Sequence, residues 1–377
     1  MITTGSVLCG VVACGIAYNL LAVAGALRFR RRRNPDTGYR PPVSILKPVK
    51  GRDPAFYEAI RSHALQAYPE FEMLFAVADA DDPALLDIAR LQAEFPALPI
   101  RVIPSANDAP NRKAGSLEIL AREAKYDVLL VNDGDILVEP DYLARVVGLL
   151  RDEAVGLVTC LYRGRGGSVA AKAEALGIAT EFAPSVLVAR LLSSSGFALG
   201  STMAFRRREL EAIGGFAAIR EYLADDFQLG ARISALGRRV AMADSVVETN
   251  LGAGDWESVW KHQLRWSRTI RVSQTAGYFG YLVTQATFWC LVVAVAGYPE
   301  VALPGLLVRL LAAAAAMWAL GGDGYGGLVW VPLRDLFGFA VWCGALSGNT
   351  VEWRGERFRL LKDGRIVSAA ETERLQP

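Results

Sequence analysis

Short apolar runs alternate with amphipathic stretches through the middle of the chain. The apolar runs predict buried strands, at 43–46, 71–78, 100–103 and 127–131. Helical spacing of apolar positions fits the segments 54–66, 83–94 and 113–124. This alternation predicts an α/β domain with a Rossmann-like, mixed but mostly parallel sheet and helices on both faces.

The amino-terminal segment predicts a membrane anchor. Residues 5–27 are almost wholly apolar and long enough to cross a hydrocarbon layer of ~30 Å as a helix. A basic cluster follows at once, formed by Arg28, Arg30, Arg31, Arg32 and Arg33. Such a cluster is retained on the cytoplasmic side, so the segment after it is expected in the cytoplasm. A cleavable signal peptide would carry its positive charge before the apolar stretch, so an uncleaved anchor is favoured.

Further apolar runs near the carboxyl terminus predict a multi-pass membrane protein. Runs 279–298 and 302–320 are each long enough to span, with a short external turn at Pro299–Glu300. The second run contains Arg309, which is tolerable there if it faces protein. Run 326–346 carries charged residues, and the basic tail after it favours the cytoplasm, so this run is expected to be interfacial or re-entrant. The predicted regions are an anchor with its basic segment, a catalytic domain with interface helices, membrane segments and a cytoplasmic tail, at 1–40, 41–275, 276–350 and 351–377.

Composition agrees with a membrane protein and excludes several kinds of site. Hydrophobic residues make up 52% of the chain, and the mean hydropathy is +0.25. A net charge of +2 gives no reason to expect a nucleic-acid partner. The five cysteines form no CxxC pair and the only histidines are His63 and His262, so a metal would be held by carboxylates.

The strongest candidate chemistry lies where the fourth predicted strand ends. The strand leads directly into Asp133-Gly134-Asp135. Two carboxylates separated by one glycine can approach a hard divalent cation, Mg²⁺ or Mn²⁺, which would bridge them to a diphosphate. Taken alone the tripeptide is weak evidence, because most such sequences are surface turns.

Asp79 ends the second predicted strand, and ligands of parallel sheets bind at such ends. Its carboxylate could accept hydrogen bonds from a nucleoside, while Asp82 before Pro83 could cap the following helix. The segment Asn111-Arg112-Lys113 also precedes a predicted helix. It could position a phosphate or base, or it could be a solvated helix start.

Two motifs lie further along the chain. Asp225 and Asp226 precede an apolar helical face, where a carboxylate could deprotonate an acceptor hydroxyl or could simply begin a solvated helix. In His262-Gln-Leu-Arg265-Trp266, the arginine could bind a departing diphosphate and the tryptophan could pack under a sugar or acceptor. The alternative is an interfacial amphipathic helix whose Trp and Arg side chains lie at lipid headgroups, and both roles are compatible.

These features together resemble membrane glycosyltransferases. An apolar anchor, an Asp ending the second strand, D-x-D, a third Asp and x-x-x-R-W before membrane segments are similar to family 2 processive enzymes. They resemble still more the ceramide glucosyltransferase family (glycosyltransferase family 21), which includes bacterial hopanoid-biosynthesis N-acetylglucosaminyl transferases. The specific stretches lie at 44–48, 157–162, 223–226 and 264–266.

The resemblance implies a GT-A fold, a UDP-sugar donor and inversion at the anomeric carbon. It implies that the catalytic residues are Asp226, the base, with Arg265 and Trp266. Donor-binding positions would be Lys47, Asp79, Lys113, Asp133, Asp135 and His262, of which Asp133 and Asp135 would hold the metal. The sequence departs from the family pattern at His262, where Gln or Arg is usual, so contact with the diphosphate or only with a neighbouring gate stays open.

The resulting expectation is an enzyme that transfers glucose or N-acetylglucosamine to the primary hydroxyl of a membrane lipid. A ceramide-type acceptor is favoured over a hopanoid. A processive polysaccharide synthase needs a protein-lined channel, for which two or three carboxyl-terminal segments are few. A catalytically silent scaffold that senses nucleotide sugars is disfavoured because the acidic positions and Arg265 are intact.

Overall fold

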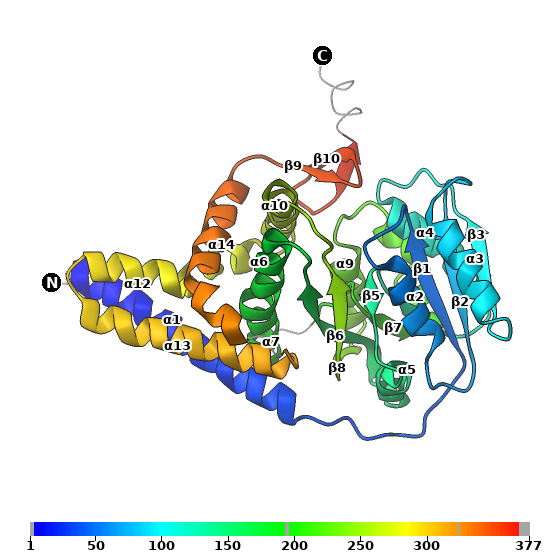
Figure 1. Cartoon of the computed structure of the whole chain (residues 1–377), viewed down its shortest axis with the longest axis horizontal. Coiled ribbons are helices and arrows are strands. Elements are labelled where there is room, and N and C mark those ends of the chain that lie inside the picture. Colours follow the sequence, from blue (N-terminus) through cyan, green and yellow to red (C-terminus); the bar gives the residue numbers. More distant parts are fainter. Residues whose placement is uncertain (1–3, 193–195, 323–324, 369–377) are drawn as a thin grey trace, which may run out of the picture.

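The computed structural model describes residues 4–192, 196–322 and 325–368. Its centre is an eight-stranded sheet in the order β3-β2-β1-β4-β7-β6-β8-β5 (Figure 1). The first four strands are mutually parallel, at Ile100–Pro104 (β3), Phe71–Val77 (β2), Val43–Val49 (β1) and Val128–Val131 (β4). The predicted strands are confirmed, although β1 continues through Lys47 and Pro48.

Helices cover both faces of this parallel half, as expected from strands that are buried on both sides. One core contains Val43, Ile45 and the helices α2 (Phe56–Ala64), α3 (Ala84–Glu94) and α5 (Tyr142–Val147). The opposite core contains Leu46 and the helices α4 (Arg112–Glu123) and α9 (Asp225–Ala235). The alternation of residues along β1 therefore divides the domain into two layers of helix around one sheet.

The second half of the sheet is mixed. Strand β7 (Met203–Arg206) is antiparallel to both β4 and β6 (Val155–Arg165). Strand β8 (Arg239–Asn250) is parallel to β6 and antiparallel to the short β5 (Ile136–Leu137). The intervening helices are η1 (Gly148–Arg151), α6 (Val169–Gly177), the π-helix η2 (Ile178–Phe182), α7 (Ala183–Leu191), α8 (Arg207–Ala212) and η3 (Phe216–Ile219).

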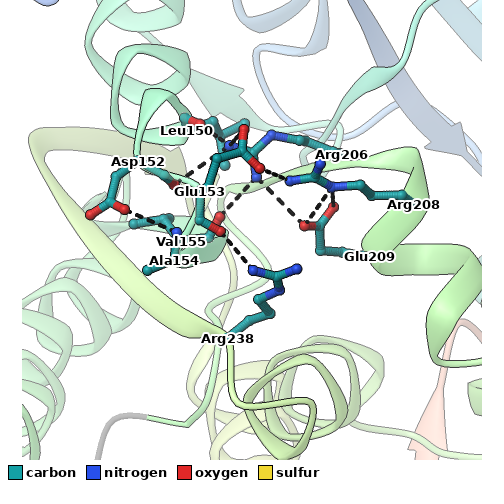
Figure 2. Close-up of polar contacts among 9 residues, drawn as sticks. All are labelled: Leu150, Asp152, Glu153, Ala154, Val155, Arg206, Arg208, Glu209 and Arg238. Atoms are coloured by element: carbon teal, nitrogen blue, oxygen red, sulfur yellow. Dashed lines mark hydrogen bonds and ion pairs between the residues drawn. The ribbon is translucent and has the colours of Figure 1, made fainter.

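A buried arginine at the end of β7 links this strand to its neighbours. The Arg206 guanidinium donates to the carbonyl oxygens of Leu150 and Val155, the latter at 3.0 Å, which closes the end of η1 against β6 (Figure 2). It also forms ion pairs of 3.5 Å with Glu153 and Glu209. Because its hydrogen bonds satisfy backbone carbonyls that burial removes from water, this cluster is a structural clamp.

Three apolar helices pack together as a bundle. Helices α1 (Thr4–Arg31), α12 (Ala286–Val295) and α13 (Pro299–Ala319) lie side by side, with the amino terminus and the α12–α13 turn at the end remote from the sheet (Figure 1). By length and hydropathy α1 and α13 could cross a membrane, as predicted. The run 279–298, which is expected to span, is divided by a bend of 45° between 275–284 and 286–295, and the pair is long and apolar enough to be one broken span or a re-entrant loop. Gln285, with φ −71° and ψ 68°, is not helical and ends η4 (Tyr281–Thr284), which follows α11 (Thr275–Gly280).

The third predicted membrane run forms a continuous helical stretch of η5 (Tyr325–Trp330) and α14 (Val331–Leu346), again long and apolar enough to cross a membrane. In Figure 1 it runs across the bundle rather than along it, and it packs on α6 and on α10 (Trp256–Ser273). Arg309 faces protein, as expected: its Nη2 lies 2.6 Å from Oδ1 of Asp335 on α14. This buried pair joins α13 to α14.

The carboxyl-terminal segment, expected only to be a tail, contains a second sheet. Strands β9 (Thr350–Trp353), β10 (Glu356–Leu360) and β11 (Ile366–Ser368) form an antiparallel three-stranded sheet. Its apolar side packs on Leu223, just before α9. The sheet is thereby placed over the carboxyl ends of the parallel strands.

Candidate active site

One cavity of about 1040 Å³ opens at the carboxyl ends of β1, β2 and β4. Its walls combine these strand ends with α7, α9, α10 and the β9–β10 hairpin. Eight of the nine predicted site residues line it, namely Asp79, Lys113, Asp133, Asp135, Asp226, His262, Arg265 and Trp266. The expected convergence of distant acidic positions on a single cleft is therefore seen in the structure.

Lys113 connects two of the acidic segments. Its Nζ lies 2.7 Å from Oδ1 of Asp133 and 3.3 Å from Oδ2 of Asp225. Burial disfavours the ammonium, but the charges of Asp133 and Asp225 outweigh that cost and raise the pKa of Lys113 above its usual value. Lys113 is thus a permanent cation at the floor of the cavity.

Lys47 lies beneath the same turn. It is fully buried in β1, and its Nζ donates to the backbone oxygen of Asp133 at 3.3 Å. Burial lowers the pKa of Lys47 to about 7, against the opposing effect of Asp135 and Asp133. The predicted donor-binding residue therefore contacts the backbone of the D-x-D turn and does not appear among the cavity-lining residues.

The D-x-D turn brings several carboxylates together. A side-chain carbon at Gly134 would lie 3.0 Å from Oδ2 of Asp53, so the glycine permits a close approach. Asp135 accepts a hydrogen bond from Thr249, while burial and the charge of Asp133 raise its pKa to about 6. Crowded carboxylates of this kind suit a divalent cation, which would relieve their repulsion. Within the described parts of the chain, no group of three or more His, Cys, Asp or Glu side chains is arranged to hold a metal ion.

Asp226 faces Asp133 across a glycine. A side-chain carbon at Gly200 would lie 3.4 Å from Oδ2 of Asp133 and from Oδ2 of Asp226. The Asp226 carboxylate accepts from the backbone amides of Gly200 at 2.9 Å and Phe227 at 2.7 Å. Burial first, and then the charge of Asp225, raise the pKa of Asp226 to about 6. Asp225 is itself buried, so this segment is not a solvated helix start.

Arg265 and Trp266 line the cavity from α10. In the part of the chain that the structure describes, the Arg265 guanidinium makes no ion pair and no side-chain hydrogen bond, so it is available to a ligand. Burial, and then the charge of Arg354, lower its pKa to about 10, where it is still a cation at neutral pH. The Trp266 ring contacts that of His262, with centroids 4.5 Å apart and the planes tilted by 58°. Nδ1 of His262 lies 2.6 Å from Oε1 of Glu174 on α6.

At the rim, capping explains part of the polar sequence. Asp82 accepts from the amide of Ala84, and Asn111 caps α4 by accepting from the amide of Ala114 at 3.0 Å. Asp79 remains exposed at the end of β2 and lines the cavity. The structure thus shows the expected helix-capping contact of Asp82, while ligand binding by Asp79 stays a prediction.

Sequence reasoning missed the hairpin that completes the cavity. Trp353, Arg354 and Phe358 line it from β9, the β9–β10 turn and β10. Alternating apolar positions around Arg354-Gly355 were the available signal, because such alternation flanking a glycine-containing turn is typical of a hairpin.

The chain resembles known proteins over most of its length. Residues 7–366 match the family described as Glycosyl transferase family 21. The chain belongs to glycosyl transferase family 21. The predicted family is therefore confirmed, and membership identifies the chain as a glycosyltransferase.

Two relatives of this family come from Caenorhabditis elegans. Ceramide glucosyltransferase 3 is 24% identical over 347 residues, covering 87% of this chain and 74% of the relative. Ceramide glucosyltransferase 1 is 27% identical over 210 residues, which is 54% of this chain but only 44% of the relative's length. Neither alignment spans the full relative.

Among solved structures, the mannosyltransferase PcManGT from Pyrobaculum calidifontis, in complex with GDP-Man and Mn²⁺, has a TM-score of 0.57. Its sequence is 21% identical, and the match covers 91% of this chain and 99% of that chain. This likeness shows the fold. The expected GT-A fold of family 21 is confirmed, together with terminal helices long and apolar enough to span a membrane.

Proposed function

We propose that this family 21 member transfers glucose or N-acetylglucosamine from a UDP-sugar to the primary hydroxyl of a membrane lipid, inverting the anomeric carbon. A ceramide-type acceptor is favoured over a hopanoid because the two relatives described above are named ceramide glucosyltransferases. The reaction would take place at the cytoplasmic face of the membrane, as the basic cluster at the end of α1 indicates.

The placement of Asp226 carries the proposal. Its carboxylate and that of Asp133 flank Gly200 in one cavity, so a base and a donor-holding group lie around one point. In a single displacement, Asp226 takes the proton of the acceptor hydroxyl while that oxygen bonds to the anomeric carbon. The bond from the anomeric carbon to the diphosphate breaks, and UDP leaves with the electron pair. No covalent sugar–enzyme intermediate is needed, which is the basis for proposing inversion.

The leaving diphosphate has cationic partners on both sides of the cavity. Lys113 lies on the floor beside Asp133, and Arg265 faces it from α10 without a protein partner among the described residues. Asp133 and Asp135 would hold Mg²⁺ or Mn²⁺, which neutralises charge on the departing diphosphate when bound. Arg265 can donate two parallel hydrogen bonds to phosphate oxygens, an arrangement that lysine cannot reproduce.

The acceptor is proposed to enter along the apolar wall. This wall consists of side chains from η2, α7, the segment before β7, and α10: Ile178, Phe182, Val186, Ala189, Phe197 and Ile270. Each methylene that a lipid buries there would contribute ~0.8 kcal/mol. Trp266 also lines the cavity, 6.3 Å from Phe182 between ring centroids, so it would contact an acceptor held along this wall.

The test uses membranes that contain the full chain, incubated with labelled UDP-glucose or UDP-N-acetylglucosamine and a lipid extract. Product glycolipids are identified by mass spectrometry. Asp226→Asn is expected to abolish transfer while UDP-sugar binding persists, because the amide keeps the shape but cannot take the proton. Asp255→Asn is the matched control, since Asp255 only caps α10 and asparagine caps equally well.

Each outcome has a defined meaning. A glycosylated ceramide confirms the favoured acceptor, and a glycosylated hopanoid selects the alternative. A polymer would replace the proposal with a processive synthase. Binding of UDP-sugar without release of UDP in the presence of lipid would leave only a nucleotide-sugar sensor. Full turnover by Asp226→Asn would refute the assignment of the base.

A further inference from the structure

We propose that Arg354, at the tip of the β9–β10 hairpin, is a further diphosphate-binding residue beside Lys113 and Arg265, and that Asp53 holds it at rest until the donor replaces Asp53 as its partner. The inference rests on the proposed function for the identity of the ligand. It adds a residue from the carboxyl-terminal sheet to a site otherwise built from the α/β domain and α10.

The backbone at this contact has positive φ on both sides. Arg354 has φ +52° and is followed by Gly355 with φ +82°, and across the cavity rim Ala55 has φ +55°. Within the described residues, Ala55 and Arg354 are the only non-glycine residues with positive φ. At Arg354 and Gly355 this is the usual geometry of a two-residue hairpin turn, which fixes the Arg354 side chain at the tip of the hairpin. Ala55 and Arg354 lie in the two segments that touch each other, 53–55 and 354–355.

The contacts of Arg354 are suited to exchange. Its Nη1 donates to the backbone oxygen of Lys50 at 2.8 Å and to Oδ1 of Asp53 at 3.2 Å, and its Nη2 donates to Oδ2 of Asp53 at 3.4 Å. The Arg354 side chain is 44% exposed, and both Arg354 and Asp53 line the cavity. The forked geometry that now meets a carboxylate would meet a phosphate equally well.

The balance of charge also favours an anionic ligand. Arg265 lies near enough for the charge of Arg354 to lower its pKa, and it has no acidic partner of its own in the described chain. Asp53 is the one carboxylate in ion-pair contact with Arg354 among those residues. Of the two guanidinium groups, Asp53 contacts only that of Arg354. Asp133 and Glu174 act on Arg265 from a distance, so the Arg265 guanidinium has no direct counter-charge within the part of the chain that the structure describes. A diphosphate would supply the missing negative charge and could accept from both guanidinium groups.

The other end of the turn keeps the hairpin in place during such an exchange. Glu356 lies 3.5 Å from Nζ of Lys50 and 3.4 Å from Nε of Arg112. These pairs do not involve Asp53, so the hairpin would remain attached when the Arg354 side chain turns toward the donor.

The test measures binding of UDP, UDP-glucose and uridine to the purified full chain in detergent by calorimetry at fixed Mn²⁺. Arg354→Met is expected to raise the Kd of UDP roughly tenfold or more, as expected for loss of charged hydrogen bonds, and to leave the Kd of uridine unchanged. Arg354→Lys should fall between wild type and Arg354→Met, because it keeps the charge but loses the fork. Arg365→Met is the matched control, since Arg365 pairs with Glu221 and Asp363 in the same sheet outside the cavity.

The Asp53→Asn variant distinguishes competition for Arg354 from a merely structural ion pair. If Asp53 competes with the donor for Arg354, Asp53→Asn lowers the Kd of UDP, and this gain disappears in the Asp53→Asn/Arg354→Met double variant. A merely structural pair predicts instead that both single variants weaken uridine and UDP alike. Should Arg354→Met fail to fold, the Kd values of UDP and uridine are compared for Arg354→Lys and Asp53→Asn instead.

Two results would overturn the inference: an unchanged Kd of UDP in Arg354→Met, or equal losses for uridine and UDP. Failure of the proposed function looks different. In that case wild-type membranes form no glycolipid, whereas the effect of Arg354 on UDP binding is still measurable.

Discussion

The elevated pKa of Asp226 predicts an acid limit to sugar transfer. The pKa of this carboxyl rises from 3.8 to about 6, chiefly through burial and then through the charge of Asp225. This difference of about two pH units corresponds to ~3 kcal/mol against the ionised form. Because the proposed general base works only when deprotonated, the rate of transfer should fall as the pH falls through about 6 and should reach its plateau well above that pH.

The size of the effect separates this environment from an ordinary carboxyl group. With a pKa of about 6, roughly a tenth of Asp226 is ionised at pH 5, so kcat/KM for the lipid should fall to roughly a tenth of its plateau. A carboxyl with the usual value of 3.8 would still be more than nine-tenths ionised there, by roughly the same relation. The assay is initial glycolipid formation from labelled UDP-sugar between pH 4.5 and 8, values chosen to span about 6.

Two perturbations identify the residue whose protonation causes the loss of activity at low pH, which we call the acid limb. Asp225→Asn removes a charge that raises the pKa of Asp226, so the acid limb should move to lower pH. Asp135 also has a pKa of about 6, but it is a candidate metal ligand, so a limb caused by Asp135 would shift with Mn²⁺ concentration. The reasoning is refuted if activity stays flat down to pH 5, or if Asp225→Asn leaves the limb where it is.

Two further predictions concern the buried charges outside the cavity. Arg206→Met should lower the free energy of unfolding by about 3 kcal/mol, because backbone carbonyls lose their buried donor. The control Arg239→Met removes only an exposed ion pair and should cost less than about 1 kcal/mol. Chemical denaturation in detergent compares the two variants, and equal costs would contradict a structural role for Arg206. Arg309→Leu should cost ~3–5 kcal/mol by leaving Asp335 buried without its partner, and the Arg309→Leu/Asp335→Leu double variant should recover most of it in thermal unfolding. A double variant as unstable as the single would show that the pair is not the cause.

The sequence located the parallel half of the domain because its signals are local. Strands β1, β2 and β4 are short and mostly apolar, and the chemistry-bearing residues Asp79, Asp133 and Asp135 follow where two of them end. Convergence of these ends is a consequence of parallel pairing, so it could be expected without coordinates. The role of Asp226 came instead from resemblance, since its neighbours in sequence fit an ordinary helix start equally well.

What could not be predicted depends on long-range contacts or on a single backbone angle. The hairpin at Arg354 meets Asp53 across about three hundred residues of chain, and no local pattern couples the two. The bend at Gln285 lies within a run whose hydropathy is that of one continuous span, so composition hides it. Likewise, nothing local indicates that Lys47 lies buried under the D-x-D turn and not in the cavity itself.

The anchor and the acceptor wall belong to one packed unit, which constrains how a lipid could reach the acidic floor. Helix α7 presents Ser185 and Ala189 to the cavity, while Leu187 packs on α1, where a side-chain carbon at Gly25 would lie 3.0 Å from it. Since α7 contributes to both contacts, the cavity lies within roughly one helix diameter, ~10 Å, of the amino-terminal membrane helix. In the proposed reaction, a hydroxyl close to the hydrocarbon chain would therefore reach Asp226 without the lipid leaving the bilayer. An acceptor whose hydroxyl sits at the end of a long polar headgroup would gain little from the apolar wall, so the geometry favours a short headgroup.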